Sequence, residues 1–292
     1  MKSNLGSKFS LIFSMVTFGT IGIFVNYTPL PSGSIAFVRG IIGGLCLVAY
    51  ALLSKTKISF KNIKDNLLIL LLSGADIGFN WIFLFEAYKN AGVPIATVCY
   101  YMAPVFIILA SPIVLKERLT AKKLICVAVA LLGMVFVSGV FKFGKISLIT
   151  LLGIAFGLLA AALYASVILL NKKLGEISAH NRTFVQLLVA GLVVLPYSLC
   201  FEKVSLENLN STAIIMLLVL GFVHTGGAYL LYFGSLKNLS AQTAAIFSYI
   251  DPIVALMLSP IILKQFMNGL EIIGTILILA AALISELPQK QK

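Results

Sequence analysis

Four ionisable residues lie within long apolar stretches of the sequence: Arg39, Asp76, His224 and Asp251. An ionisable group surrounded by hydrocarbon costs several kcal/mol, so such residues usually serve a ligand, an ion or a proton. A carboxylate can hold an ammonium group, and a guanidinium can hold a carboxylate through two parallel hydrogen bonds. Together these residues predict a site for a small molecule that carries an amine.

Aromatic and amide residues accompany these four along the chain. The further candidates for the lining of the site are Asn80, Trp81, Tyr100, Tyr101, Tyr229 and Tyr249. A buried phenol needs a hydrogen-bond partner, which favours a polar cavity around Tyr101 and Tyr249. Pro104 and Pro252 follow these two tyrosines at the same spacing, and each removes a backbone hydrogen bond. We therefore expect a substrate-binding cavity beside two kinked helices, with the two prolines as hinges.

Structural roles compete with this interpretation. Arg39 is closer in depth to Glu86 than to the middle of the membrane, so it could form a tie or a gate with that carboxylate instead of binding substrate. Asp76 and Asp251 could pair with Arg39 or with helix ends, and the aromatic residues could serve packing alone. The pattern Tyr-x-x-Pro occurs in both halves of the chain, and this duplication favours the cavity.

The sequence holds no motif of a membrane-embedded enzyme. Neither G-x-S-x-G nor H-E-x-x-H occurs, and the two histidines, His180 and His224, are far apart. The cysteines lie in apolar segments without CxxC spacing: Cys46, Cys99, Cys126 and Cys200. We expect no catalytic residue, no metal site and no cofactor. Product formation without vectorial transport would instead support an intramembrane enzyme.

The composition is that of a membrane protein. Hydrophobic residues make up 60% of the 292 residues, charged residues make up 11%, and the mean hydropathy is +1.06. Soluble domains are far less apolar, and segments of about 20 apolar residues are long enough to cross a bilayer. The formal net charge of +12 lies in short loops between such segments, so we assign it to membrane orientation and expect no nucleic-acid partner.

A diverged duplication organises the chain. Residues 88–117 read YKNAGVPIATVCYYMAPVFIILASPIVLKE, and residues 236–265 read LKNLSAQTAAIFSYIDPIVALMLSPIILKQ. At a constant offset of 148 residues, Tyr101 aligns with Tyr249 and Pro104 aligns with Pro252. Apolar bias alone does not repeat two prolines and a tyrosine at identical spacing. The two halves of the chain are therefore expected to share one fold.

The apolar segments predict ten membrane-spanning helices, five in each copy. Their expected positions are 9–27, 33–53, 67–89, 93–115, 121–141, 147–170, 181–200, 212–234, 241–263 and 269–286. The first copy then occupies residues 1–141 and the second copy residues 147–286. An odd number of spans per copy makes the second copy cross the membrane in the opposite direction. We expect an all-α membrane protein with two inverted five-helix repeats, an architecture of alternating-access transporters.

Loop charges give the orientation. With the N-terminus in the cytoplasm, basic loops at 55–64, 116–123 and 172–182 face the cytoplasm, and loops at 142–145 and 202–207 face out. The loop KERLTAKK after the fourth span becomes KQFMNGLE after the ninth, so the second copy has lost positive charge where it faces out. Both termini of this multi-pass protein are expected to be cytoplasmic.

Asp76 and His224 are also 148 residues apart and occupy equivalent places in the two copies. Inverted repeats bring such places near a shared axis at the membrane midplane, so we expect these two residues to face each other. Burial disfavours the charged form of a carboxylate, whereas a substrate ammonium favours it. Substrate and protons would then compete for Asp76 and Asp251, with His224 biasing the exchange near neutral pH. Proton antiport follows as a prediction, with facilitated diffusion as its alternative.

Three pairs of glycines have the GxxxG spacing that allows close helix packing. They are Gly40 and Gly44, Gly74 and Gly78, and Gly153 and Gly157. Such pairs serve contacts within one chain or a dimer face. The protein is expected to be a monomer or a homodimer.

The two five-span copies, each with a proline in its fourth span, resemble the EamA branch of the drug/metabolite transporter superfamily. The run L-x-E-x-x-T of Leu115, Glu117 and Thr120, followed by Gly133, carries the same resemblance. It implies a bacterial exporter of amino acids, other small metabolites or toxic organic compounds, with a substrate path between the halves. Glu117 is replaced by Gln265 in the second copy, and we expect this change to weaken a cap or surface ion pair without abolishing transport.

These observations lead to a secondary transporter in the cytoplasmic membrane that exports small amine-bearing metabolites, with amino acids as the main candidates, by alternating access. Its partners would be the lipid bilayer, a small-molecule substrate and, with antiport, protons. The alternative within transport is a facilitative, channel-like or carrier protein for other small metabolites or organic cations. Saturable flux with counterflow would separate a carrier from a channel.

Overall fold

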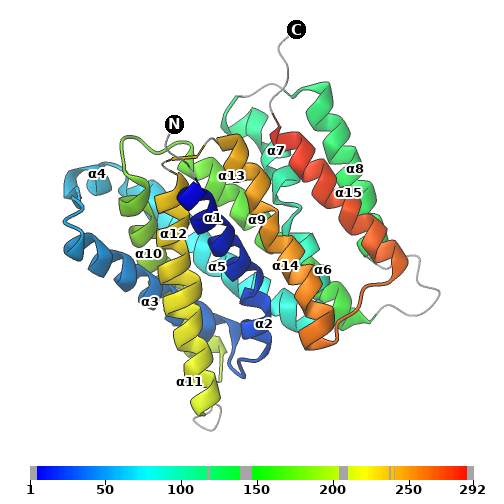
Figure 1. The fold of residues 1–292 in the computed structure, drawn as a ribbon, viewed down its shortest axis with the longest axis horizontal. Helices are drawn as coiled ribbons and strands as arrows, with labels where there is room; N and C mark the ends of the chain where they lie inside the picture. The colour runs from blue at the N-terminus through cyan, green and yellow to red at the C-terminus, as the bar shows by residue number, and fades with distance from the viewer. Residues whose placement is uncertain are drawn as a thin grey trace.

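The computed structural model describes residues 5–116, 119–138, 147–203, 210–236, 238–239 and 241–287, and it contains helices and no strand within these ranges (Figure 1). The helices of the first half are α1 (Leu5–Gly19), α2 (Ile21–Asn26), α3 (Ser32–Leu53), α4 (Phe60–Asp65), α5 (Leu67–Ala91), α6 (Val93–Tyr100), α7 (Ala103–Val114) and α8 (Ala121–Val137). Those of the second half are α9 (Leu148–Asn171), α10 (Ala179–Phe201), α11 (Ser211–Leu218), the π-helical segment η2 (Val219–Gly227), α12 (Ala228–Leu236), α13 (Ala241–Ser248), α14 (Ile250–Leu258), the π-helical segment η3 (Ser259–Leu263) and α15 (Gly269–Glu286).

Nine stretches of the described chain are long and apolar enough to cross a membrane, and they coincide with nine of the ten predicted spans. The remaining predicted span, at 121–141, corresponds to α8, whose 17 described residues stop just before a range that the structure does not describe. Glu117, Arg118 and the loop at 142–145 also lie outside the described residues.

Two spans are interrupted at equivalent positions. α6 stops at Tyr100 and α7 starts at Ala103, while α13 stops at Ser248 and α14 starts at Ile250. The breaks therefore include Tyr101 and Tyr249, the pair related by the repeat, and each lies shortly before a proline whose missing N–H cannot continue the helix. These are the places at which the sequence predicts kinks.

The first and eighth spans depart from regular helix as well. The first is divided at Thr20 between α1 and α2, and the eighth widens into η2 between α11 and α12. A π-helical turn holds an extra residue, so it changes the direction in which the following side chains point. Such segments occur often at functional sites.

Packing joins the two halves of the chain along their whole length. α3 packs against α10, α5 packs against α9 and α10, and α8 packs against α15. Close approach requires glycine here: a Cβ on Gly40 would lie 2.6 Å from the backbone nitrogen of Gly191. The neighbours of the three predicted GxxxG pairs lie on α10, α5 and α6, so these glycines serve contacts within the chain.

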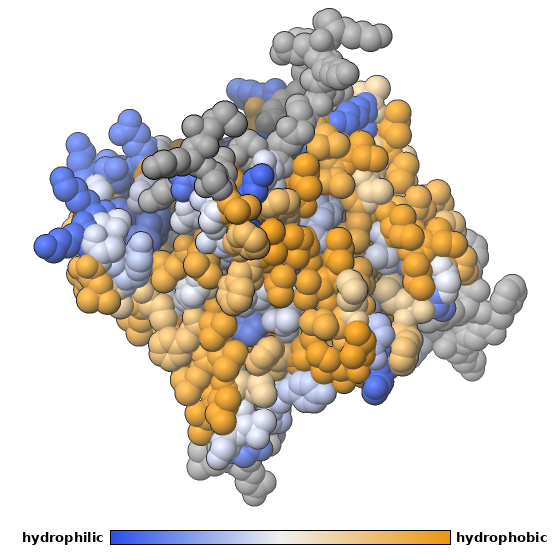
Figure 2. All heavy atoms as spheres, viewed as in Figure 1, coloured by the Kyte–Doolittle hydropathy of each residue, from blue (hydrophilic) through white to orange (hydrophobic). Residues whose placement is uncertain are grey.

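The surface has an apolar middle and two polar ends. Figure 2 shows apolar residues over most of the visible face and hydrophilic residues toward its ends, most densely around α4. Large apolar side chains such as Ile113 and Phe9 are exposed, as expected where lipid replaces water. We call the end that holds α4, the start of α1 and the end of α15 the α4 end, and the opposite end the α2 end (Figure 1).

Candidate functional site

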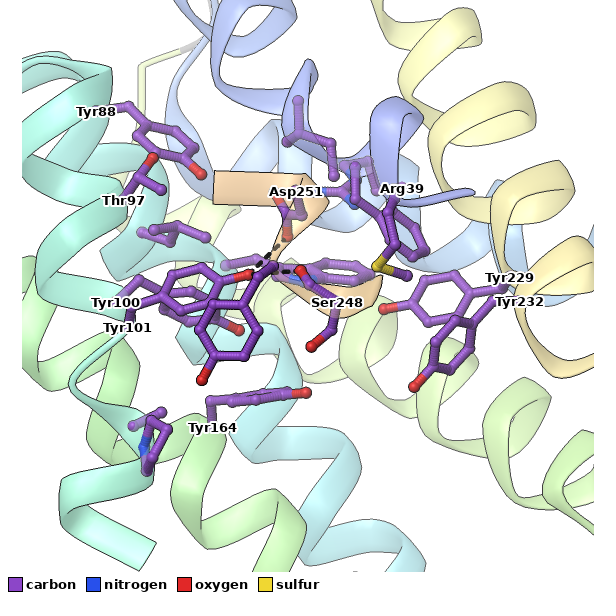
Figure 3. Close-up of a pocket in the computed structure, with 18 of the residues that line it drawn as sticks. Arg39, Tyr88, Thr97, Tyr100, Tyr101, Tyr164, Tyr229, Tyr232, Ser248 and Asp251 are labelled. Atoms are coloured by element: carbon purple, nitrogen blue, oxygen red, sulfur yellow. Dashed lines mark hydrogen bonds between the residues drawn. The ribbon is translucent and has the colours of Figure 1, made fainter. Parts of the chain in front are cut away.

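A cavity of about 260 Å³ lies in the middle of the helix bundle. Its lining comes from α1, α2, α3, α5, α6, α7, α9, α12, α13, α14 and α15, together with the breaks at Tyr101 and Tyr249. The predicted hinge residue Pro104 lines the cavity. Seven predicted binding residues line it as well: Arg39, Trp81, Tyr100, Tyr101, Tyr229, Tyr249 and Asp251. Figure 3 shows most of these side chains gathered around one central space.

The two helix breaks meet at this cavity. The rings of Tyr101 and Tyr249 lie 5.9 Å apart between centroids. The hydroxyl of Tyr101 donates to Asp251 Oδ2 at 3.4 Å and to the carbonyl of Ser248 at 3.3 Å (Figure 3). Thus the break in one half supplies a donor to the carboxylate that the other half presents.

Asp251 lies in the first turn of α14, where the helix dipole favours a negative charge. The break after α13 makes this helix start inside the bundle and not at its surface. The structure therefore places an acidic side chain at an internal helix N-terminus, facing a cavity. This geometry can hold an ammonium group with a charge-assisted hydrogen bond.

Arg39 is 2% exposed and forms another wall of the cavity. Its Nε donates to Thr225 Oγ1 at 3.1 Å, and its guanidinium lies 4.4 Å from the ring centroid of Trp81 and 5.4 Å from that of Phe85. These contacts keep the planar group in one orientation. Within the described residues, no hydrogen bond occupies its terminal nitrogens, so a ligand carboxylate could accept from them.

The alternative tie between Arg39 and Glu86 is not formed in this structure. Glu86 Oε1 accepts from the hydroxyl of Ser32 at 2.6 Å, and Glu86 Oε2 accepts from the side-chain amide of Asn90 at 3.3 Å. Both partners lie at the α2 end of the bundle. Glu86 thus fastens the turn before α3, and Arg39 points to the cavity.

Tyrosines form most of the remaining wall. Seven of the ten tyrosines of the chain line the cavity: Tyr88, Tyr100, Tyr101, Tyr164, Tyr229, Tyr232 and Tyr249. Tyr100 and Tyr164 stand 5.4 Å apart between ring centroids, and Phe18 lies 5.3 Å from Tyr229. Aromatic faces attract cations, and phenolic hydroxyls can accept from an ammonium group. The walls therefore suit an organic amine.

Asp76, Asn80 and His224 do not line the cavity. Asn80 donates to the carbonyl of Ala160 and lies beside Tyr100, so it packs behind the residues that line the cavity. The carboxyl group of Asp76 lies beside Ser166 of α9. Its assignment as a binding residue stays a prediction.

His224 is buried in η2 and is hydrogen-bonded to Thr20 Oγ1 at 2.9 Å. Its ring also packs on Phe24 at 4.7 Å between centroids. These partners belong to the break of the first span, whereas Asp76 faces α9, so the expected meeting of these two repeat-related residues does not occur. The neighbouring Thr225 is the residue that holds Arg39, which connects η2 to the cavity wall.

Several lining residues were absent from the predicted site. They include Tyr88, Thr97, Tyr164, Ser248 and Glu286. Glu286 could have been noticed in the sequence, because it is an acidic residue at the end of a span on the side of the membrane where the loops are basic. Tyr164 carried none, since a tyrosine near the end of a span is also typical of the membrane interface.

The cavity differs at its two ends. Toward the α4 end it reaches Glu286, which is exposed. Toward the α2 end it stops at Tyr88, which is buried near the end of α5. Two hydrogen bonds join neighbouring segments at this end. Gln265 Oε1 accepts from the backbone N–H of Val93 at 2.7 Å, which caps α6, and the hydroxyl of Tyr27 donates to the carbonyl of Ile262 at 3.3 Å. Gln265 thus caps α6, so the replacement of the acidic residue at this position leaves a cap in place.

Within the part of the chain that the structure describes, no group of three or more His, Cys, Asp or Glu side chains could hold a metal ion. Cys99 and Cys126 are buried, and Cys200 is exposed. The polar groups that can bind a ligand in the cavity are therefore the side chains of Arg39, Asp251 and Glu286 and the hydroxyl groups of the lining.

The EamA-like transporter family model matches residues 7–139 and again residues 151–287. An "Uncharacterized transporter YxxF" of Bacillus subtilis is 32% identical over 272 residues, covering 92% of this chain and 86% of that protein. A "Probable amino-acid metabolite efflux pump" of Salmonella typhimurium is 28% identical over 234 residues, covering 76% of this chain and 77% of the pump. "Protein PecM" of Dickeya dadantii is 26% identical over 220 residues, covering 74% of this chain and 72% of that protein.

A protein of known crystal structure matches with a TM-score of 0.65 and 17% sequence identity, over 97% of this chain and 96% of its own. At this identity the likeness concerns the fold alone.

Proposed function

Because the chain belongs to the EamA-like transporter family, we propose that it is a secondary transporter that exports small amine-bearing metabolites, with amino acids as the main candidates, across the cytoplasmic membrane. One observation carries the substrate class: Asp251 and Arg39 line a single cavity whose other walls are largely tyrosine. Asp251 would bind the ammonium group, and Arg39 would bind a carboxylate where the substrate has one.

The proposed architecture is ten transmembrane helices in two inverted repeats, residues 1–141 and 147–286. In support, the family model matches twice, and the breaks at Tyr101 and Tyr249 are 148 residues apart. α8 would be the fifth span, completing the first repeat. We assign the α4 end to the cytoplasm because Lys55, Lys57, Lys61 and Lys64 lie in and next to α4, and we propose that both termini are cytoplasmic.

With this orientation, the cavity reaches the surface on the cytoplasmic side and is closed on the outer side. Alternating access would then require release of the contacts at the α2 end, including those between Gln265 and Val93 and between Tyr27 and Ile262. The breaks before Pro104 and Pro252 would supply the hinges, since a helix without continuous backbone bonds bends at low cost. The substrate site lies between the two hinges.

Two alternatives share this site. A facilitative or channel-like protein would use the same cavity without counterflow, and the tyrosine wall also suits organic cations without a carboxylate. Proton antiport adds competition between protons and substrate for Asp251. A membrane-embedded enzyme has less support, because family and relatives' names point to transport.

The direct test is counterflow in proteoliposomes with a panel of labelled amino acids and their decarboxylated amines. The panel includes phenylalanine and phenylethylamine, which differ only by the carboxylate. Saturable uptake that is accelerated by unlabelled substrate inside supports a carrier, and flux without such acceleration supports a channel. If no member of the panel crosses faster than in empty liposomes, the proposed substrate class is wrong.

Coupling is tested in the same vesicles with an imposed pH gradient. An acidic interior should drive accumulation of substrate from the outside if one proton leaves as one substrate enters. Uptake that only reaches equal concentrations on both sides would indicate facilitated diffusion.

Topology is tested with single cysteines on a cysteine-free background. An impermeant maleimide applied to intact cells should label the loop at 202–207 and not the loop at 116–123. Equal labelling of both loops would contradict the inverted orientation of the repeats.

A further inference from the structure

Glu286, the last residue of α15, lies at the cytoplasmic mouth of the cavity in the proposed orientation. It is exposed and lines the cavity that also contains Asp251. Tyr164, Tyr232 and Tyr249 line the same cavity as both carboxylates. Tyrosine rings thus line the path from this residue toward the deeper acidic group.

Helix stability does not explain an acidic residue at this place. The C-terminal end of a helix carries partial negative charge, so a carboxylate in its last turn is unfavourable. Among the described residues, no hydrogen bond or ion pair engages the Glu286 side chain. The nearby ammonium of Lys122 donates to the carbonyl of Leu287 at 2.6 Å.

The charges around Glu286 give a reason for an acidic residue at the end of α15. The α4 end is basic, with Lys55, Lys57, Lys61 and Lys64 around α4 alone. A surface of one sign raises the local concentration of oppositely charged solutes and lowers that of solutes with the same sign. A cationic substrate that approaches from this side is therefore repelled by the surface, and a carboxylate at the mouth offsets the repulsion.

We propose that Glu286 is an entry site that captures ammonium groups at the cytoplasmic mouth and passes them to Asp251. This inference rests on the proposed function, and it adds a second carboxylate along the same path. Substrates with a net positive charge depend on Glu286 more than zwitterions do, because zwitterions are not repelled by a basic surface. The contribution is one of capture, so it acts on KM measured from the cytoplasmic side.

Inside-out membrane vesicles containing the full chain test this proposal, with labelled phenylethylamine as the cationic probe and phenylalanine as the zwitterion. Glu286→Gln should raise the KM for phenylethylamine about two- to fivefold, which is the range of a solvent-exposed charge pair, and should leave the maximal rate unchanged. Glu286→Asp should restore most of the loss. The difference between the variant and the parent should shrink as salt is raised, because salt screens exposed charges.

Glu176→Gln is the matched control. It removes the same charge from the loop between α9 and α10 at the same end, but Glu176 does not line the cavity. The proposal requires this variant to keep the parent KM. An equal rise in both variants would mean that only the overall surface charge matters, and an unchanged KM in Glu286→Gln would also overturn the entry site.

The outcomes separate this inference from the function on which it rests. If Glu286→Gln behaves like the parent while Asp251→Asn loses transport, the entry site is wrong and the transporter assignment stands. If the parent carries no member of the amine panel, both proposals fall together. Protein amounts in the vesicles, measured for each variant, exclude a loss that is due to poor insertion.

Discussion

The break between α6 and α7 and the break between α13 and α14 have the same framework but different chemistry. Both contain a tyrosine at the break and a proline three residues later, and both contribute to one cavity. At the repeat offset of 148 residues, however, Asp251 corresponds to Ala103, and both residues line that cavity. The duplication thus supplies a paired scaffold, and a single divergent position supplies the charge.

Arg39 shows the same division of roles. Its counterpart in the second half is Leu187, which is buried in the hydrophobic core. The two charged residues proposed to bind substrate therefore come from opposite halves, and the residue at the equivalent position of the other half is apolar in both cases. An asymmetric substrate with an ammonium group and a carboxylate suits such a site.

The largest effect is expected when the charge of the second break is removed. Asp251→Asn should lower kcat/KM for amines about tenfold to a hundredfold, since a hydrogen bond to a charged group contributes about 1.5–3 kcal/mol. Proteoliposome counterflow measures this, and thermal melting of the purified protein checks that the fold survives.

A swap then tests whether the two breaks are interchangeable. Ala103→Asp combined with Asp251→Ala moves the carboxylate to the other break of the same cavity. Partial recovery relative to Asp251→Ala alone would support the view that the scaffold is symmetric and the charge is not. No recovery would mean that the surroundings of α14, including the hydroxyl of Tyr101, are also required.

Removal of the charge on α3 should separate two kinds of substrate. Arg39→Gln is expected to weaken transport of phenylalanine about tenfold, because the guanidinium no longer holds the carboxylate, and to change that of phenylethylamine much less. The ratio of the two kcat/KM values is the measurement. Glu86→Gln serves as the control, since Glu86 binds Ser32 and Asn90 and should leave the ratio unchanged. Equal losses for both probes in Arg39→Gln would assign Arg39 to structure.

The membrane fold and much of the cavity could be predicted from the sequence, because hydropathy and the repeated Tyr-x-x-Pro pattern report on local chain properties. The orientations of Asp76 and His224 could not be predicted, and the meeting of these two residues that the repeat predicts is not formed. Sequence spacing gives the depth of a residue in the membrane, but not the direction in which its side chain points. The wide turn of η2 changes that direction for His224, and Asp76 faces Ser166.

The contribution of Glu286 of α15 to the cavity lining also could not be predicted from the sequence. Its last residue reaches the cavity only because α15 packs against α8 and lies close to α6, α7 and α13, and such long-range packing has no local signature. The charge pattern of the sequence shows that an acidic residue at position 286 is unusual, but it does not predict that the side chain lines the cavity.

A moderate effect is expected when the two breaks are made continuous. Pro104→Ala and Pro252→Ala each restore a backbone N–H and should favour straighter helices, changing the transport rate a few-fold with little loss of folding. If the scaffold is symmetric, the two variants should change the rate by similar factors. Labelling of a cysteine at the α2 end reports the balance between outward-open and inward-open states. Parent rates in both variants would make the breaks purely structural.

The smallest effect concerns the cap of α6. Gln265→Ala removes the acceptor for the Val93 N–H and should lower the free energy of unfolding by about 1 kcal/mol, the usual cost of losing a helix cap. Gln265→Glu, which restores the residue type of Glu117, should instead stabilise the protein by about 0.3–1 kcal/mol through the helix dipole. Thermal melting in detergent measures both changes. Transport by either variant should stay within a few-fold of the parent.

Direct binding to the purified protein tests the assignment of the ammonium site to Asp251. Titration calorimetry with phenylethylamine should give the same Kd for the parent and for Asp76→Asn, whose side chain lies outside the cavity lining, and a Kd at least about tenfold higher for Asp251→Asn. Retained binding in Asp251→Asn together with loss of binding in Asp76→Asn would contradict the assignment and move the site to the face of α5 that packs on α9.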